Sequence, residues 1–367
     1  MHNLPTLLVN VDVCKANIKR MAEKAANGKV AFRPHFKTHQ SIEIGRWFKE
    51  VGVKSITVSS VEMADYFAAD GWNDITVAFP LVPGSIDKVN DLAQKVSLNI
   101  TVSSAKNLLA SIDKLTAPLG IFIEVDVGHH RTGVAPDNMR EIALMVSQLA
   151  SKPNLTFKGF LAHAGHSYSA KGADEVNTIY NTGVSQLVKL KSFWRETYPN
   201  IIISWGDTPT CSLIDEFWGI DEIRPGNFVF YDLTQSNIGS CNIQDIAVAL
   251  ICPIVDINTQ RSEVAIHGGA IHLSKDTLTN ANNETVYGMV CNFNGKKWGT
   301  PIDEAYIKSV SQEHGIVKFN NEIPLQNLRV GDLLAVLPVH SCLTLDTMGL
   351  LSTPAGKTIE TFRTRKY

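Results

Sequence analysis

Arg33-Pro34-His35-Phe36-Lys37-Thr38-His39 follows the short apolar run 30–32, which is typical of a β-strand. The stretch holds an arginine, a lysine and two histidines within seven residues. Burial and neighbouring positive charge both favour the neutral form of a lysine. Lys37 could then act as a nucleophile and form a Schiff base with a carbonyl group. A solvated basic turn explains the same residues by themselves, so the rest of the chain has to decide between the two interpretations.

Strand-like and helix-like segments alternate over the first 240 residues or so. The strand-like segments are 29–32, 55–58, 74–78, 97–102, 120–125, 157–162, 201–204 and 222–225. Alternation of this kind predicts an α/β fold with a parallel sheet. Eight units suit a closed (β/α)8 TIM-type barrel better than an open sheet. A doubly wound sheet is the alternative, but no Gly-rich dinucleotide fingerprint follows the first strand.

The pattern changes after residue 242, where short strand-like segments alternate with polar turns and helical spacing is scarce. The segments are 245–257, 261–267, 285–290, 304–313, 315–318 and 332–337. This pattern predicts a second, C-terminal all-β domain of about 125 residues. The opening strand near 6–11 could join either part on its pattern alone.

Composition excludes several classes of partner and location. The chain has 367 residues and a formal net charge of −2, so nucleic acid and anionic membranes are not expected partners. No apolar run reaches the roughly 20 residues of a membrane span, and no signal peptide is evident. The six cysteines are scattered without paired spacing, which favours reduced thiols and a cytoplasmic location.

Polar residues follow several of the predicted barrel strands, at the carboxyl ends where barrel chemistry takes place. They lie in the segments 124–134, which includes Arg131, 163–168, 206–210 and 224–227. A small-residue turn before a helix suits a phosphate, because free N–H groups and the helix dipole both favour an anion. Each turn alone is equally typical of a helix cap. Together with a Schiff-base lysine and the histidine and tyrosine residues, they indicate pyridoxal 5′-phosphate.

A metal pair is suggested by Pro338-Val339-His340-Ser341-Cys342 in the β domain. Residues i and i+2 at the end of a strand point the same way, so His340 and Cys342 could converge on one ion. Imidazole plus thiolate suits zinc. A strand-end histidine beside a buried free cysteine is the alternative interpretation. His267 and His272 form a second candidate pair, but their spacing across two glycines fits no regular element and argues against a metal role.

These segments, taken as a group and in this order, resemble the D-threonine aldolase and D-serine dehydratase family. That family comprises alanine-racemase-like, fold-type III pyridoxal phosphate enzymes. The resemblance covers nearly the whole chain. It implies a cofactor-binding barrel over 10–240, and a β domain over 241–367 that also takes the N-terminal strand 1–9 and carries the metal pair. It also implies a small-molecule D-amino acid substrate and a homodimer.

The resemblance further implies roles for single residues. Lys37 would carry the cofactor, Arg131 would lie near its ring oxygen, and Tyr168 would lie near the pyridine nitrogen or ring face. His163 would be a further cofactor contact. The phosphate would be held by Thr208, Gly226 and Asn227. A divalent metal, with zinc as the expected ion, would be bound by His340 and Cys342 beside the substrate's β-hydroxyl.

Two lyase reactions fit this set. In a D-serine dehydratase-like reaction, Lys37 removes the Cα proton and the metal activates the β-hydroxyl as a leaving group, giving a 2-oxo acid and ammonia. In a D-threonine aldolase-like reaction, His39 or His163 takes the β-hydroxyl proton, and glycine and an aldehyde form. A racemase and a non-enzymatic pyridoxal phosphate carrier are further alternatives.

Two details bear on that choice. Dehydratases of the family commonly show His-x-Cys at the metal pair and its aldolases His-x-Asp, so His340-Ser341-Cys342 favours a dehydratase. His267 stands where the family often has aspartate, which leaves the substrate end of the pocket open.

Overall fold

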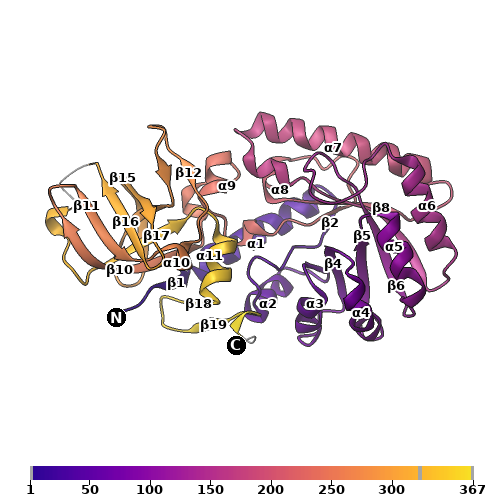
Figure 1. The fold of residues 1–367 in the computed structure, drawn as a ribbon, viewed down its shortest axis with the longest axis horizontal. Coiled ribbons are helices and arrows are strands. Elements are labelled where there is room, and N and C mark those ends of the chain that lie inside the picture. The colour runs from indigo at the N-terminus through magenta and orange to yellow at the C-terminus, as the bar shows by residue number, and fades with distance from the viewer. Residues whose placement is uncertain (1–2, 321–324, 365–367) are drawn as a thin grey trace. The chain divides into compact units, whose positions relative to one another are not determined.

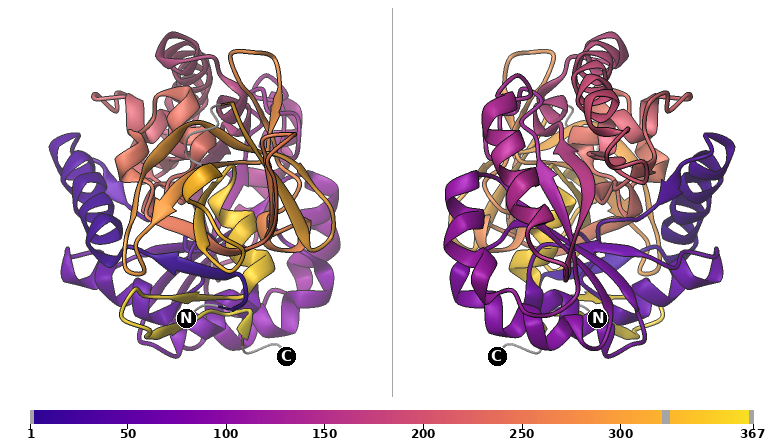
Figure 2. Two further views of the ribbon diagram at one scale, coloured as in Figure 1. Left: turned by 90° about the vertical axis from the view of Figure 1, so that its left-hand side faces the viewer. Right: turned by 90° about the vertical axis from the view of Figure 1, so that its right-hand side faces the viewer.

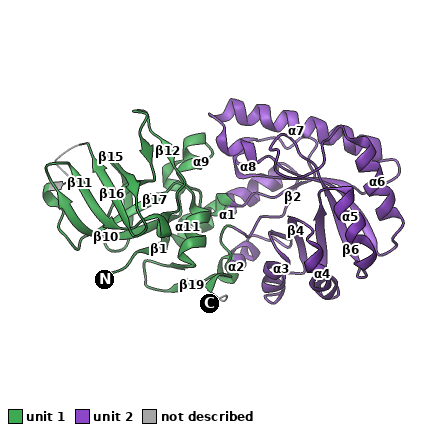
Figure 3. Cartoon of the chain, viewed as in Figure 1, with its two compact units in different colours: residues 1–18, 38–44, 227–367 green, residues 19–37, 45–226 purple. Residues whose placement is uncertain are grey.

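The computed structural model describes residues 3–320 and 325–364, which fall into two compact units (Figure 3). Unit 1 comprises residues 1–18, 38–44 and 227–367, and unit 2 comprises residues 19–37 and 45–226. Figure 1 labels their helices and strands. None of the helices within the described ranges is long and apolar enough to cross a membrane.

Unit 2 is built on a curled parallel sheet of eight strands in the order β2-β9-β8-β7-β6-β5-β4-β3. The strands are β2 (Ala31–Phe32), β3 (Ile56–Val58), β4 (Asp74–Pro80), β5 (Ser97–Val102), β6 (Leu119–Glu124), β7 (Leu155–His163), β8 (Ile202–Gly206) and β9 (Glu222–Ile223). A parallel bridge between His35 and Thr57 joins the two ends of the sheet. There Phe36 N–H donates to Thr57 O at 2.8 Å, and Thr57 N–H donates to Pro34 O at 2.9 Å. The predicted TIM-type barrel is confirmed.

One helix precedes β2, and the others connect consecutive strands on the outside of this sheet (Figure 2). They are α1 (Val11–Asn27), α2 (Ile42–Glu50), α3 (Val61–Ala68), α4 (Ile86–Ala93), α5 (Ala105–Ser111), α6 (Met139–Ala150), α7 (Ala173–Trp194) and α8 (Thr208–Leu213). Serine side chains begin two of them, as Ser60 Oγ accepts from Met63 N–H and Ser104 Oγ accepts from Asn107 N–H. Short 3₁₀ helices are η1 (Pro83–Ser85), η2 (Ile112–Lys114), η3 (Gly165–Ser169), η4 (Asn227–Val229), η5 (Ile243–Asp245) and η6 (Leu325–Asn327).

Unit 1 contains a mainly antiparallel sheet in the order β11-β16-β15-β14-β17-β10-β1-β18-β19. Its strands are β1 (Thr6–Val9), β10 (Val248–Asn258), β11 (Glu263–His267), β14 (Gly288–Phe293), β15 (Trp298–Val310), β16 (His314–Phe319), β17 (Leu333–Pro338), β18 (Leu350–Ser352) and β19 (Thr358–Glu360). A hairpin joins β12 (Leu278–Thr279) to β13 (Thr285–Val286). One part of β10 pairs with β17 and the rest with β11, which closes a barrel. Strand β1 pairs with β10.

Unit 1 also contains helices that the sequence pattern does not predict. These are α9 (Leu233–Ile238), α10 (Ala270–Leu273) and α11 (Ser341–Met348). The prediction that His340 and Cys342 end a strand is wrong, because β17 stops at Pro338 and His340 is the N-cap of α11. Cys342 therefore lies in the first turn of a helix.

A buried polar network crosses the interior of the unit 2 barrel. Arg33 Nε lies 2.6 Å from Glu222 Oε2, and Arg33 Nη1 lies 2.7 Å from Asp74 Oδ1. The second oxygen of Glu222 accepts from the Ser204 hydroxyl at 2.6 Å, and Ser204 Oγ accepts from Arg224 Nε at 2.7 Å. Both arginines and Glu222 are less than 10% exposed. The first residue of the basic stretch is thus an interior anchor, and the network holds Arg224 at the carboxyl end of β9.

We expect Arg33→Ala to lower the free energy of unfolding by about 3–5 kcal/mol, because it leaves the buried Glu222 carboxylate without its cation. Urea denaturation at neutral pH measures this. Lys88→Ala is the matched control, since it removes an exposed ion pair with Glu62 and should leave the urea midpoint nearly unchanged. Equal midpoint shifts in the two variants would contradict the structural role of the network.

Candidate active site

Lys37 follows β2 and is exposed, although its neighbours Phe36 and Thr38 are fully buried. The Phe36 ring packs edge-on against Phe67 and Trp72, at centroid distances of 5.0 and 5.1 Å. This aromatic cluster fixes the backbone on one side of the lysine. The expectation that burial acts on Lys37 is therefore wrong, because Lys37 is exposed while Phe36 and Thr38 are buried.

Several cations gather with Lys37 at the carboxyl ends of the barrel strands. Burial is the main cause that lowers the pKa of His35 and of His163 well below the usual value, and the charges of Lys37, Arg131 and Arg224 act in the same direction on both. Both imidazoles are therefore neutral, and the surrounding charge is positive. This part of unit 2 is suited to an anionic ligand.

His163, the last residue of β7, has a defined tautomer. Its Nδ1 lies 2.8 Å from the carbonyl oxygen of Gly206. Because a carbonyl oxygen only accepts, Nδ1 carries the proton and Nε2 keeps its lone pair. The ring lies 6.3 Å from that of Tyr168 between centroids. His163 can therefore accept a hydrogen bond through Nε2 but is hard to protonate.

The turn after β8 contains a buried hydroxyl group that suits a phosphate. Asp207 caps α8 by accepting from Thr210 N–H at 2.7 Å and from the Ser167 hydroxyl at 3.0 Å. Thr208 N–H donates to the Tyr168 hydroxyl oxygen at 3.2 Å. Thr208 Oγ1 is buried and has no hydrogen-bond partner within the described ranges. Because an unpaired buried hydroxyl is costly, this atom fits the oxygen of a bound anion.

Asp207 and Arg224 also lie in this region, and neither was among the predicted site residues. Burial raises the pKa of Asp207 to about 6, against several hydrogen bonds. Burial also lowers the pKa of Arg224 to about 10, and Arg224 Nη2 donates to Ala162 O at 2.6 Å. An aspartate directly before Thr-Pro is a recognisable helix N-cap signal. Arg224 carries no comparable local signal, because its partners lie on other strands.

His340 and Cys342 of unit 1 interact electrostatically with each other. Burial opposes the charged form of each, but the interaction between the two side chains outweighs it. This interaction raises the pKa of His340 to about 10 and lowers that of Cys342. Cys342 Sγ also lies 3.3 Å from Thr38 Oγ1 and 3.5 Å from Asn227 Nδ2. The structure thus brings the predicted pair together at the first turn of a helix, with the pKa of the Cys342 thiol lowered.

Two aspartates position this pair. Asp276 Oδ2 lies 2.7 Å from His340 Nδ1, which leaves Nε2 of His340 for other contacts. Asp232 Oδ2 accepts from Ser341 N–H at 3.0 Å and from Asn227 Nδ2 at 2.6 Å. The Asn227 side chain is therefore engaged beside Cys342, and a phosphate contact by Asn227 would fall to its backbone N–H. Nothing in the sequence spacing points to either aspartate, since Asp276 is 64 residues and Asp232 is 109 residues from its partner.

His39 belongs to unit 1 and is fully buried. Its Nδ1 accepts from Ser41 N–H at 3.1 Å, so the neutral ring carries its proton on Nε2. Burial lowers the pKa of His39 to about 3. The lone pair of His39 is thus already used, and the residue is poorly suited to accept a proton from a substrate.

The donor chemistry fits both predicted groups. In unit 2, an exposed lysine, two arginines, neutral imidazoles and the unpaired Thr208 hydroxyl match an aldehyde-bearing phosphate ester such as pyridoxal 5′-phosphate. In unit 1, one imidazole and one thiol of lowered pKa match a borderline-soft divalent ion.

Two family models match the chain. One, described as alanine racemase, N-terminal domain, matches residues 9–233, and the other, described as putative serine dehydratase domain, matches residues 247–353. A D-serine dehydratase of Dictyostelium discoideum is 28% identical over 378 residues, covering 93% of this chain and 91% of the relative.

Solved structures resemble the whole chain. The D-threo-3-hydroxyaspartate dehydratase of Delftia sp. HT23 superposes with a TM-score of 0.89 at 25% identity, covering 98% of this chain and 97% of that one. Two variants of that enzyme replace a histidine and, two positions later, a cysteine by alanine; the cysteine variant is in a metal-free form. A D-threonine aldolase from Filomicrobium marinum, at 17% identity and a TM-score of 0.81, covers 99% of this chain and 98% of its own and shares the fold.

The buried histidines predict a pH dependence of stability. The pKa of His39 is about 3 when folded and about 6.5 when unfolded. The unfolded chain therefore binds more protons between these values, so the free energy of unfolding should fall as the pH drops from about 6.5 towards 3. His35 and His163 act in the same direction.

We expect His39→Asn to reduce proton uptake on unfolding by up to about one proton per chain. The free energy of unfolding should then fall less steeply as the pH drops from about 6.5 towards 3. Denaturant titrations at several pH values measure this slope. His314→Asn, at an exposed position, is the control and should keep the wild-type slope. An unchanged slope in His39→Asn would contradict its neutral buried state.

Proposed function

Since the chain belongs to the alanine racemase N-terminal domain family, whose model spans residues 9–233, we propose that it is a pyridoxal phosphate- and metal-dependent lyase of D-β-hydroxy amino acids. The proposed reaction is dehydration of D-serine or a similar substrate to a 2-oxo acid and ammonia. Relatives named D-serine dehydratase and D-threo-3-hydroxyaspartate dehydratase support this, because the match with this chain covers 91% of each of them.

The His340–Cys342 pair, whose side chains favour each other's charged forms, is the observation that carries the proposal. Its His-x-Cys spacing equals that of the histidine and cysteine replaced in the Delftia dehydratase variants, one of which is metal-free. A thiolate and an imidazole on one helical turn favour zinc among divalent ions. We therefore assign the metal to this pair.

In this proposal Lys37 carries the cofactor covalently and moves the proton at the substrate Cα. Pyridoxal 5′-phosphate, when bound, supplies an electron sink that makes the Cα–H bond acidic. Thr208 offers its buried hydroxyl to the phosphate, with the backbone N–H groups of Gly226 and Asn227 as further donors. Arg131 and Tyr168 complete the cofactor contacts, at the ring oxygen and at the ring itself.

The positive charge around Lys37 also suits the negative groups of the cofactor and the substrate. The neutral His163 offers Nε2 as an acceptor, while Arg131 and Arg224 stabilise negative charge on the phosphate or on a substrate carboxylate. Because His35 and His163 are neutral, they do not add further repulsion to the lysine.

His340 and Cys342 would hold a divalent ion, which would supply the Lewis acidity that makes the β-hydroxyl a better leaving group. The Asp276 carboxylate lies 2.7 Å from His340 Nδ1. It would hold the Nδ1 proton while His340 loses its Nε2 proton to bind the ion. Asp232 holds the start of α11 in place. The chain thus supplies two ligands, and water or substrate takes the remaining positions.

The other functions have less support from the site. An aldolase needs a base for the β-hydroxyl, but the lone pair of His39 is engaged with Ser41. His163 is a weak base, because burial holds its pKa well below the usual value. A racemase needs a second acid/base opposite Lys37, for which we assign no residue. A carrier of the cofactor would have no use for the second domain at residues 247–353 or for its His340–Cys342 pair.

A substrate panel tests the proposed function. Purified protein loaded with cofactor and zinc is incubated with D-serine, D-threo-3-hydroxyaspartate and D-threonine, with the L-enantiomers as controls. We expect 2-oxo acid and ammonia from a D-substrate, and loss of that product with a chelator. Glycine plus an aldehyde would indicate the aldolase instead, and the absence of every product would refute a lyase.

Replacing the cofactor lysine should remove the cofactor's spectroscopic signature. We expect Lys37→Ala to lose the visible absorption of lysine-bound pyridoxal phosphate and its reducible covalent link, because no amine remains at that position. Spectrophotometry and borohydride trapping with mass spectrometry measure both. Lys106→Ala, on the outer helix α5, is the control. A retained covalent link in Lys37→Ala would show that another lysine carries the cofactor.

Loss of the aspartate behind the metal ligand should weaken metal binding alone. We expect Asp276→Asn to lower zinc affinity about 10–100-fold, since an outer-shell carboxylate orients the ligand histidine. Cys342→Ala should lose this zinc altogether while keeping the cofactor absorption. Asp303→Asn, at an exposed position of β15, is the control. Unchanged zinc affinity in Asp276→Asn by chelator competition would contradict its positioning role.

Two further expectations follow from the family. The protein should be a homodimer, which light scattering after gel filtration measures. All six cysteines are free thiols, which supports a reducing compartment such as the cytoplasm.

A further inference from the structure

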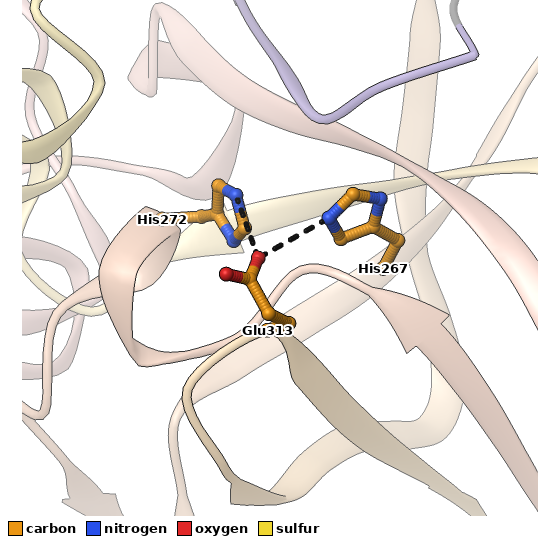
Figure 4. A group of neighbouring side chains, drawn as sticks. All are labelled: His267, His272 and Glu313. Carbon is orange, nitrogen blue, oxygen red and sulfur yellow. Dashed lines mark hydrogen bonds and ion pairs between the residues drawn. The ribbon is translucent and has the colours of Figure 1, made fainter.

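His267, His272 and Glu313 form a second cluster of metal-binding side chains, in unit 1 (Figure 4). One ligand atom of each lies within 4.8 Å of the others. His267 Nε2 and His272 Nε2 lie 3.4 Å and 3.9 Å from the same carboxylate oxygen, Glu313 Oε2. Figure 4 shows both imidazole rings turned towards that oxygen. We infer that these three residues form a second divalent-metal site, separate from the His340–Cys342 pair, for zinc or a similar transition-metal ion.

The donor set points to this class of ion. Two imidazoles and one carboxylate are a set that zinc uses at sites with an open position. Calcium and magnesium prefer oxygen ligands throughout. Metal–ligand bonds of about 2.0–2.2 Å in tetrahedral geometry put neighbouring ligand atoms roughly 3.3–3.6 Å apart. The 3.4 Å between His267 Nε2 and Glu313 Oε2 already fits this range. The 3.9 Å between His272 Nε2 and Glu313 Oε2 needs only a small side-chain adjustment.

The backbone brings the three side chains together. The segment after β11 is fixed to the turn between β15 and β16 by Gly268 N–H to Glu313 O at 2.9 Å and Ala270 N–H to Ser311 O at 2.8 Å. A Cβ atom on Gly269 would lie 2.4–2.6 Å from backbone atoms of that turn. Glycine is therefore required for this close approach. The two glycines that break the regular spacing of the histidines thus serve to place Glu313 between them.

The exposure of the three side chains suits a loaded site that exchanges with solvent. The relative exposures are 29% for His267, 12% for His272 and 44% for Glu313. An ion could therefore enter without unfolding the domain, and one position would stay open to water. The His267 ring lies edge-on to that of His272, at 5.3 Å between centroids and 85°. The two rings thus present their nitrogen atoms to the carboxylate and do not stack.

One hydrogen bond of His272 must be given up when the ion binds. His272 Nδ1 accepts from Gly269 N–H at 3.2 Å, so the neutral ring holds its proton on Nε2. Binding through Nε2 moves that proton to Nδ1 and gives up this bond. The loss of one long hydrogen bond weakens binding by up to about tenfold. A site with three protein ligands can tolerate this, and we expect weaker binding here than at a fully preorganised zinc site.

The cluster connects to the helix that carries Cys342. Thr347 Oγ1 of α11 donates to the carbonyl oxygen of His272 at 3.1 Å, and Thr344 Oγ1 donates to Leu273 O at 3.2 Å. An ion bound at His272 would therefore stiffen α10, on which α11 rests.

Metal counting on the holoprotein tests the inference. Zinc-saturated protein is desalted and measured by elemental analysis, together with Cys342→Ala, Glu313→Gln and the double variant. We expect two, one, one and no zinc ions per chain. Removing a ligand should weaken zinc binding at that site more than about 100-fold, beyond the loss of an outer-shell group. His267→Gln repeats the test at a second ligand, and His314→Asn, a neighbouring histidine outside the cluster, should keep both ions.

Cobalt substitution distinguishes the two ions spectroscopically. The thiolate-to-cobalt charge-transfer band should vanish in Cys342→Ala and persist in Glu313→Gln. A wild-type count of one that Cys342→Ala abolishes would overturn the inference, as would a count of two in Glu313→Gln. Loss of an ion in His314→Asn would overturn the assignment of ligands. The counts do not depend on lyase activity, so failure of the proposed function would leave this test intact.

Discussion

The position of His340 and Cys342 depends on the buried carboxylate of Asp232. That carboxylate is 1% exposed and accepts hydrogen bonds from Ser341, from Asn227 and from Gln235 N–H at the start of α9. Because burial raises the pKa of Asp232, these donors are needed to keep it charged. The same contacts begin α11 at Ser341 and so place the thiolate of Cys342 beside the imidazole of His340. One long-range interaction therefore creates the ligand pair that the proposed metal requires.

In unit 2, buried charged groups are held in place by hydrogen bonds inside the barrel. Arg33 and Arg224 are both buried and share the Glu222–Ser204 network, so their positive charge is held within the barrel at a fixed place. His35 and His163 are kept neutral in the same region. The charges of Lys37, Arg131 and Arg224 then leave a site that attracts an anion. This is the environment that a pyridoxal phosphate lyase needs, and the proposed reaction adds the Lewis acidity of the ion in unit 1.

Periodicity was enough to predict the barrel, because eight alternating strands and helices in about 230 residues leave few other arrangements. Lys37 and the turn at Thr208 were also predictable, since strand ends and helix caps are local signals. The start of α11 was not, because the strand-like alternation through Val339 is ended by Asp232, 109 residues away from Ser341. The His267–His272–Glu313 cluster escaped prediction for a related reason. Its histidine spacing is irregular, and Glu313 reaches it only through the pairing of β11 with β16.

The proposed lyase reaction requires a catalytic divalent ion at His340 and Cys342. Anomalous diffraction at the zinc absorption edge, on crystals of the active, cofactor-loaded protein, can detect this ion. We expect an anomalous peak bonded to His340 Nε2 and Cys342 Sγ, with a zinc–sulfur distance of about 2.3 Å. Active crystals without a peak at this pair would contradict it.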